Sequence, residues 1–318
     1  MGNLEMTRPM RVKNKKSFAA MLHKDFIQHK YIYLIALPVI VYFFIFKYIP
    51  MYGAIIAFKN FSPGKGIIGS EWVGLTNFTN FFSSIYFFRV VRNTLLINLY
   101  GLIIGFPAPI ILALMINEVI NIKFKRVVQT VTYMPYFVST VVVAGIILDF
   151  VSLNGIVNDI LVLIGKERTT LMMNSDYFRT IYIFSDIWQG IGFGSIIYLA
   201  SIAGIDQELY EASKIDGANK FRQVLHITLP GIAPTIVIML ILRIGGMMNL
   251  GFEKIILLYN PSIYETADVI SSFVYRRGLL EFNFSYSTAV GLFNSVINCI
   301  LLISANKISR KLQETSLW

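Results

Sequence analysis

The chain has 318 residues, of which 55% are hydrophobic and 14% carry a charge, and its mean hydropathy is +0.63. This composition excludes an ordinary soluble domain of the same length and indicates a protein that crosses a membrane several times. The net charge of +10 requires no nucleic-acid partner, because basic loops beside anionic lipid account for it.

Residues 1–30 form a polar, basic N-terminal arm, and an apolar run follows over about 31–58. That run is long enough to span a membrane. Lys47 and Pro50 interrupt it, so we expect the first helix to end near them. Residues 31–84 are therefore assigned to a first transmembrane helix and an outer loop.

Five further runs are long and apolar enough to span a membrane, at about 94–116, 127–150, 180–205, 232–252 and 286–304. Together with the first run they predict an all-α membrane protein with six transmembrane helices. An even number of spans places both termini on the same side of the membrane.

Lysine and arginine gather in the N-terminal arm, in the loops after the second and fourth runs, and in the tail 306–318. Cytoplasmic segments carry such an excess of basic residues. We therefore expect both termini to be cytoplasmic in a multi-pass protein of the cell membrane. The outer loops then fall near 59–88, 151–178 and 253–284.

The loop between the fourth and fifth runs has a distinctive pattern. Residues 211–230 read Glu-Ala-Ser-Lys-Ile-Asp-Gly-Ala-Asn-Lys-Phe-Arg-Gln-Val-Leu-His-Ile-Thr-Leu-Pro. Asp206 is a suitable N-cap for a short helix from about Gln207 to Asp216, and Gly217 can supply the left-handed residue that ends it. A second helical turn then carries Phe221, and Pro230 and Pro234 mark the entry to the fifth span.

This loop resembles the "EAA" loop of bacterial ABC-importer permeases, with Ser213 in place of the second alanine. The segment Trp72–Phe78 is also similar to sugar permeases of this type, and the segment around Tyr133–Ser139 is similar to permeases of oligosaccharide importers of Gram-positive bacteria. The resemblance covers about residues 70–310 and is to maltose-permease-like carbohydrate uptake proteins. It implies a type-1 ABC importer permease core over 85–305, with a coupling loop at 206–230 and one additional N-terminal helix.

The resemblance also implies partners and a function. The chain would be the permease subunit of an importer for oligosaccharides, most similar to those for plant-polysaccharide or uronate-containing fragments. Its partners would be a second homologous permease, two ATPase subunits that bind ATP and Mg²⁺, and an extracellular solute-binding lipoprotein. The residues expected to contact the ATPase are Glu211, Ala212, Ser213, Asp216, Gly217, Phe221, Ile227, Leu229 and Pro230.

A sugar path needs aromatic faces for stacking and amides that hydrogen-bond hydroxyl groups. The fourth, fifth and sixth spans offer such residues, and in maltose-permease-like proteins the sugar contacts come from these helices. For each residue, helix packing is the alternative role. The candidates are Trp188, Gln189, Gly190, Phe193, Arg243, Met247, Met248, Asn249, Gly251, Asn294 and Asn298.

Arg243 lies within the fifth apolar run, where an unpaired charge is costly. We expect it to be chiefly structural, with Asp186 or Asp149 as its partner. Contact with substrate is the alternative.

The sequence offers no catalytic set and no expected cofactor or metal in this chain. It lacks the Gly-x-x-x-x-Gly-Lys-Ser/Thr pattern of a P-loop, its histidines lack metal-ligand spacing, and Cys299 is its only cysteine. A stand-alone secondary transporter of a polar solute is the alternative function. The EAA-like loop and the lack of an intramembrane carboxylate relay argue against it.

Overall fold

The computed structural model describes residues 27–313, with side chains described to residue 311. Most of the predicted N-terminal arm and the end of the predicted tail lie outside the described residues. The chain divides into two compact units, Met1–Ala54 and Ile55–Trp318, and each is described by itself.

The described part of the first unit is one helical segment. Helix α2 (Lys30–Phe43) continues through a π-helical turn (Phe44–Tyr48) into α3 (Ile49–Met51), and helical structure persists as a 3₁₀ segment to Phe58. The α-helix therefore ends at Met51, next to Pro50 as expected, and 3₁₀ structure continues to Phe58. A proline ring clashes with the carbonyl four residues earlier, and the wider π turn before Pro50 accommodates it.

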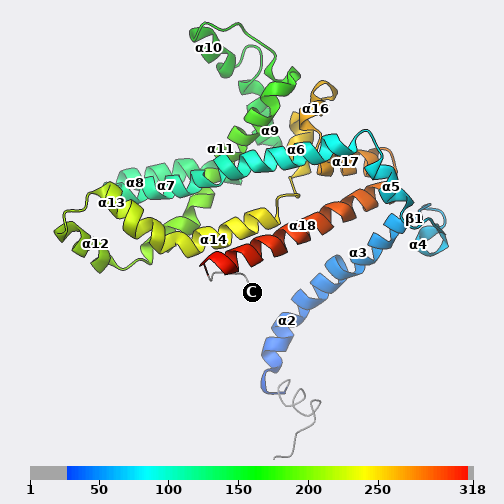
Figure 1. Cartoon of the computed structure of the whole chain (residues 1–318), viewed down its shortest axis with the longest axis horizontal. Coiled ribbons are helices and arrows are strands. Elements are labelled where there is room, and N and C mark those ends of the chain that lie inside the picture. Colours follow the sequence, from blue (N-terminus) through cyan, green and yellow to red (C-terminus); the bar gives the residue numbers. More distant parts are fainter. Residues whose placement is uncertain (1–26, 314–318) are drawn as a thin grey trace, which may run out of the picture. The chain divides into compact units, whose positions relative to one another are not determined.

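The second unit is a bundle of long helices joined by short helical and extended segments (Figure 1). Strands β1 (Lys59–Asn60) and β2 (Glu71–Trp72) pair antiparallel, Lys59 opposite Trp72. The helices are α4 (Gly66–Gly69), α5 (Thr76–Phe82), α6 (Phe87–Tyr100), α7 (Pro107–Glu118), α8 (Ile122–Tyr133), α9 (Thr140–Phe150), α10 (Ile156–Leu163), α11 (Ser175–Ala203), α12 (Gln207–Ile215), α13 (Lys220–Gln223), α14 (Leu229–Gly245), α15 (Phe252–Leu258), α16 (Tyr264–Ala267), α17 (Ile270–Tyr275) and α18 (Phe284–Gln313).

Five helical segments of the described chain are long and apolar enough to cross a membrane: Lys30–Phe58, Phe87–Glu118, Ser175–Ala203, Lys220–Gly245 and Phe284–Lys311. A sixth span is a bent pair, Ile122–Phe137 with Thr140–Phe150. The six predicted spans are therefore confirmed in number when the bent pair counts as one.

The third span is not the single helix expected over 127–150. Its two halves meet at 105°. Pro135 lies in a 3₁₀ turn, Val138 is extended, and the Ser139 hydroxyl accepts a hydrogen bond from the Val142 amide to start the next helix. A proline followed by an N-cap serine ends one helix and begins another.

The fifth span is displaced from the expected 232–252. Helical structure runs without interruption from Lys220 to Gly245, through a π-helical turn at Val224–Thr228 that accommodates Pro230. Residues 246–251 then leave the helix, so the predicted end was too late by about two turns.

Three buried apolar clusters hold the second unit together. One joins α9, α11 and α15 around Phe178 and Ile255, and the others centre on Phe81 and on Ile232. Helix α11 also meets α8 backbone to backbone, because a Cβ placed on Gly192 would lie 2.0 Å from the Thr132 carbonyl oxygen. Only glycine allows that approach.

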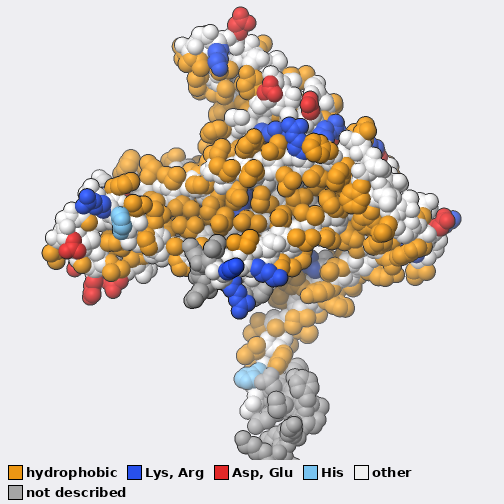
Figure 2. Space-filling model, viewed as in Figure 1, with side chains coloured by type: hydrophobic (Ala, Val, Ile, Leu, Met, Phe, Trp, Pro, Cys, Tyr) orange, Lys and Arg blue, Asp and Glu red, His pale blue; other side chains and the backbone are white. Residues whose placement is uncertain are grey.

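The surface matches a protein surrounded by lipid. Hydrophobic side chains cover most of the helical face seen in Figure 2, and charged side chains gather over α12 and α13 and along one edge of the bundle. Such an apolar band is what the hydrocarbon region of a bilayer requires.

Candidate functional site

The loop between α11 and α14 forms a helix hairpin that projects beyond one end of the bundle (Figure 1). The Asp206 carboxylate accepts a hydrogen bond from the Glu208 amide and caps α12, as expected. Gly217 has φ +75°, the left-handed conformation that favours glycine at a helix end. Asn219 then caps α13 through the Arg222 amide. We call residues 206–230 the coupling hairpin.

Side-chain hydrogen bonds brace the two arms of the coupling hairpin. The Gln223 amide donates to the Ser213 hydroxyl at 2.9 Å, and the Tyr210 and Thr228 hydroxyls lie 2.9 Å apart. Gln223 and Thr228 are buried. The serine that replaces the second alanine of the EAA pattern therefore contributes a bond that alanine could not make.

The outer surface of the coupling hairpin exposes apolar side chains. Ile215 is 88% exposed and Phe221 is 74% exposed. Glu211, Ala212 and Asp216 are also exposed, whereas Ile227 and Leu229 are half-buried against the bundle.

Two adjoining cavities lie beside the middle of α11, and Asp186 lines both. The first, of about 250 Å³, is also lined by Gly190 and Arg243. Arg243 is exposed, and its guanidinium lies over Gly101. In the described chain neither Asp186 nor Asp149 forms an ion pair or hydrogen bond with it, so the expected pairing is wrong.

The second cavity has a volume of about 360 Å³ and contains the predicted residues Gln189 and Gly251. Lys254 on α15 also lines it, and its Nζ lies 3.7 Å from Asp186 Oδ1. Lys254 is therefore the cation that Asp186 faces, in place of Arg243.

The remaining aromatic candidates lie elsewhere. Trp188 lines a separate apolar cavity with Phe150 and Phe184. Phe193 stacks on Tyr136 with ring centroids 3.9 Å apart, so one face of its ring is already covered. Neither Trp188 nor Phe193 therefore lines the cavity of Gln189 or the cavity of Arg243.

The predicted residues after α14 form a polar anchor. The Asn298 side chain accepts a hydrogen bond from the Met248 amide, and the Asn294 amide donates to the Met248 carbonyl and to Asn249. Met248 is buried in the core, and Met247 lies just before it outside the helix. Packing therefore accounts for Met248, Asn294 and Asn298.

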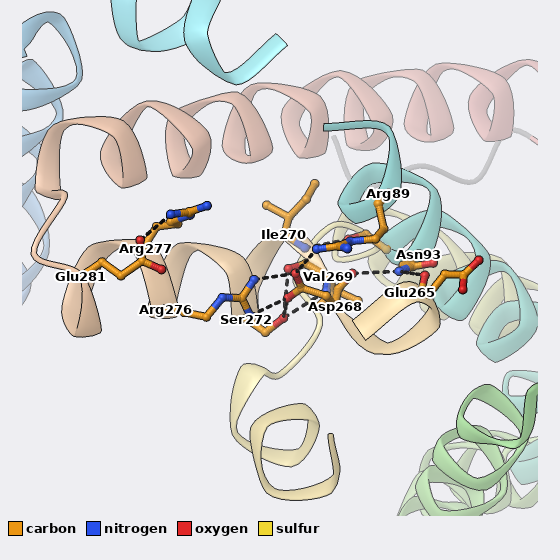
Figure 3. A network of polar contacts seen from close by, with 11 residues as sticks. Arg89, Asn93, Glu265, Asp268, Val269, Ile270, Ser272, Arg276, Arg277 and Glu281 are labelled. Atoms are coloured by element: carbon orange, nitrogen blue, oxygen red, sulfur yellow. Dashed lines mark hydrogen bonds and ion pairs between the residues drawn. The ribbon is translucent and has the colours of Figure 1, made fainter. Parts of the chain in front are cut away.

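A buried charge network ties the other end of the bundle together (Figure 3). Asp268 is fully buried and accepts two hydrogen bonds from Arg276, at 3.1 and 2.6 Å, and one from Ser272. Arg89 lies 3.5 Å away, and the Asn93 amide donates to the Asp268 carbonyl. We call these five residues the Asp268 network.

The Asp268 network fixes α16 and α17 against α6. Burial lowers the pKa of Arg276, but the hydrogen bonds and charge of Asp268 outweigh it, so the pKa lies above its usual value. Arg276 therefore stays charged, as a buried carboxylate requires.

Sequence reasoning missed Lys254 and the Asp268 network. Lys254, Asp268, Ser272 and Arg276 lie in the segment expected to be an outer loop over 253–284, whereas Arg89 and Asn93 lie on α6. The short apolar run Ile255–Leu258 was the available signal that part of this segment is buried. In the described residues no group of His, Cys, Asp and Glu could hold a metal ion.

Membrane-crossing helices, a break in the helical backbone beside mid-bundle cavities, and a protruding polar hairpin together define a transport permease. Residues 105–314 match the family described as "Binding-protein-dependent transport system inner membrane component". The chain belongs to that family, and it is the permease of an ABC importer for sugars or oligosaccharides.

Similar proteins support this assignment. The polygalacturonan/rhamnogalacturonan transport system permease protein YteP of Bacillus subtilis (strain 168) is 45% identical over 92% of this chain and 91% of that protein. A chain in the crystal structure of a bacterial ABC transporter involved in the import of the acidic polysaccharide alginate is 43% identical, with a TM-score of 0.85. That match covers 92% of this chain and 99% of the other.

The alginate ABC transporter has also been solved in complex with an alginate pentasaccharide-bound periplasmic protein. A chain of that complex is 42% identical to this one with a TM-score of 0.86, over 93% of this chain and 99% of the other. Identity at this level supports the same type-1 permease fold.

Proposed function

We propose that this chain translocates uronate-containing oligosaccharides, driven by a separate ATPase that acts on the coupling hairpin. The observation that carries the proposal is the hairpin itself, which is rigidly capped and braced yet exposes Ile215 and Phe221. A surface of this kind fits a cleft in a partner protein.

The mechanism follows from the attachment of the hairpin. Its arms continue into α11, which lines both mid-bundle cavities, and into α14, which lines the first. When the ATPase subunits close on ATP and Mg²⁺, they would move the hairpin and tilt these helices. The cavities would then open alternately to the two sides of the membrane, which is alternating access.

Acidic saccharides are the proposed substrate class because two similar proteins belong to transporters of polygalacturonan/rhamnogalacturonan and of alginate. The proposed assembly contains a second homologous permease, two ATPase subunits and an extracellular solute-binding lipoprotein. Both termini would be cytoplasmic, on the side of the coupling hairpin, in the cell membrane of a Gram-positive bacterium.

The test is uptake of trigalacturonate by cells of the source organism with this gene deleted and then restored. We expect uptake to disappear on deletion and to return with the wild-type chain, and to stop when cellular ATP is exhausted while the membrane potential is clamped. Uptake that follows the ion gradient and persists without ATP would favour the stand-alone secondary transporter instead.

A further inference from the structure

Lys254 is a buried cation with no protein hydrogen bond. Its side chain is 7% exposed, and its Nζ has no hydrogen-bond partner in the described chain. The nearest carboxylate oxygen, Asp186 Oδ1, is 3.7 Å away, and the Tyr182 ring centroid is 5.4 Å away. An ammonium group has three donors. Leaving them unused in a buried site is costly unless a ligand takes them up.

The backbone around Lys254 is irregular at membrane depth. Helix α14 ends at Gly245, and residues 246–251 run without helical structure until α15 begins at Phe252, apart from a turn at 246–248. Asp186 lies eleven residues into α11, about 17 Å from its start and near the middle of the helix. Irregular backbone at this depth is tolerated where it lines a cavity, and transporter binding sites lie there.

The charges around the two adjoining cavities, taken together, balance. Lys254 lines the second cavity and Arg243 the first, while Asp186 lines both and Glu253 lines the second. The Asp186 side chain is 48% exposed, so it is free to accept another bond. A balanced set with adjacent donors and acceptors suits hydroxyl groups, which both donate and accept. A free anion would have to displace Asp186 from Lys254.

We propose that Lys254 and Asp186 together bind adjacent hydroxyl groups of the translocated sugar. The ammonium donates to one hydroxyl oxygen, and the carboxylate accepts from the neighbouring hydroxyl. Gln189 and Thr140, on the same cavity wall, supply further polar groups. This inference rests on the proposed function and adds to it the residues that hold the sugar ring at mid-membrane.

The test measures uptake of trigalacturonate and of α-1,4-linked galactotriose, which share hydroxyl groups and differ in the carboxylates. Lys254→Met and Asp186→Asn should each lower the maximal rate at least tenfold for every trimer that the wild type imports. The half-saturating concentration should stay unchanged, because an external binding protein would set it. Lys166→Met, an exposed lysine in another loop, is the matched control and should match the wild type.

The double variant Lys254→Met/Asp186→Asn separates binding from folding. It removes both charges, so a purely structural pair would regain uptake, whereas a binding pair would not. Each chain is also quantified in the membrane. Lys254→Arg, which keeps the charge and the donors, should recover part of the rate.

Recovery of uptake in the double variant, or unchanged uptake by Lys254→Met, would overturn this inference and leave the transport proposal intact. Loss confined to trigalacturonate would also overturn it, in favour of carboxylate recognition. A wild-type chain that imports neither trimer would overturn the proposed substrate class, and this inference with it.

Discussion

The two ends of the bundle differ in whether their side chains find partners within the chain. At one end the Asp268 network buries a carboxylate and satisfies it within the chain. At the other end the coupling hairpin is braced by Ser213 and Gln223 but leaves Ile215 and Phe221 exposed. The first end is complete in the single chain, and the second has a surface that only another protein would complete. Changes at the first should therefore affect folding, and changes at the second should affect function.

The largest effect is expected from Asp268→Asn. It would leave Arg276 and Arg89 beside a neutral group in a buried site, and breaking a buried ion pair costs about 3–5 kcal/mol. We expect little full-length chain in the membrane and a lowered unfolding temperature of the remainder. Asp159→Asn is the control, because its partner Arg168 is exposed and such pairs contribute about 1 kcal/mol or less. Equal abundance of the two variants would contradict the comparison.

At the coupling hairpin, Gly217→Pro should abolish transport and leave insertion unchanged. Proline cannot adopt φ +75°, and it lacks the amide that Gly217 donates to the Lys214 carbonyl. Glu211→Lys should have the same effect through its exposed charge. Both are measured as uptake and as co-purification of the ATPase. Wild-type uptake and wild-type ATPase co-purification for either variant would contradict the proposed coupling role.

Ser213→Ala should have a smaller effect. It restores the alanine of the EAA pattern but leaves the buried Gln223 amide without its partner, at a cost of about 1–3 kcal/mol. We expect uptake to fall a few-fold, with the chain still present in the membrane. Ser213→Thr, which keeps the hydroxyl, is the control. An unchanged rate for Ser213→Ala would show that the brace is dispensable.

The smallest effect on the chain itself is expected from Ile215→Cys in a Cys299→Ala background, because the Ile215 side chain is 88% exposed and packs against little within the chain. The amount of chain in the membrane should be nearly unchanged. A membrane-impermeant maleimide should label the cysteine in inside-out vesicles stripped of the ATPase and leave it unlabelled in intact cells. Labelling from outside intact cells would overturn the predicted orientation and with it the coupling role.

Local signals predicted the coupling hairpin well. The Asp206 cap and the left-handed Gly217 were expected from their residue types and are confirmed. These features depend on neighbours within a few residues, which is the range over which capping and turn chemistry act. The break near Pro135 had a local signal too, but the apolar run around it concealed the break.

Other features depend on long-range contacts, and the sequence did not predict them. The end of the fifth span is set by Asn294 and Asn298, which bind the Met248 backbone from nearly fifty residues away. Hydropathy carries no information on such a bond, so Met247–Asn249 were placed on a helix that had already ended. Lys254 was likewise unpredictable, because only the fold brings α15 beside Asp186.

The contact of Gly192 with the Thr132 carbonyl has a mechanical consequence. Two backbones in direct contact can pivot but can scarcely slide, so this point acts as a fulcrum for α11. From Gly192 the helix extends about 17 Å toward the coupling hairpin and about 9 Å to Asp186. A rigid α11 would therefore convert a displacement of the hairpin into an opposite displacement of about half that size at Asp186 and the cavities that it lines. The displacement at Asp186 would then be smaller than that of the hairpin, and the force there would be correspondingly larger.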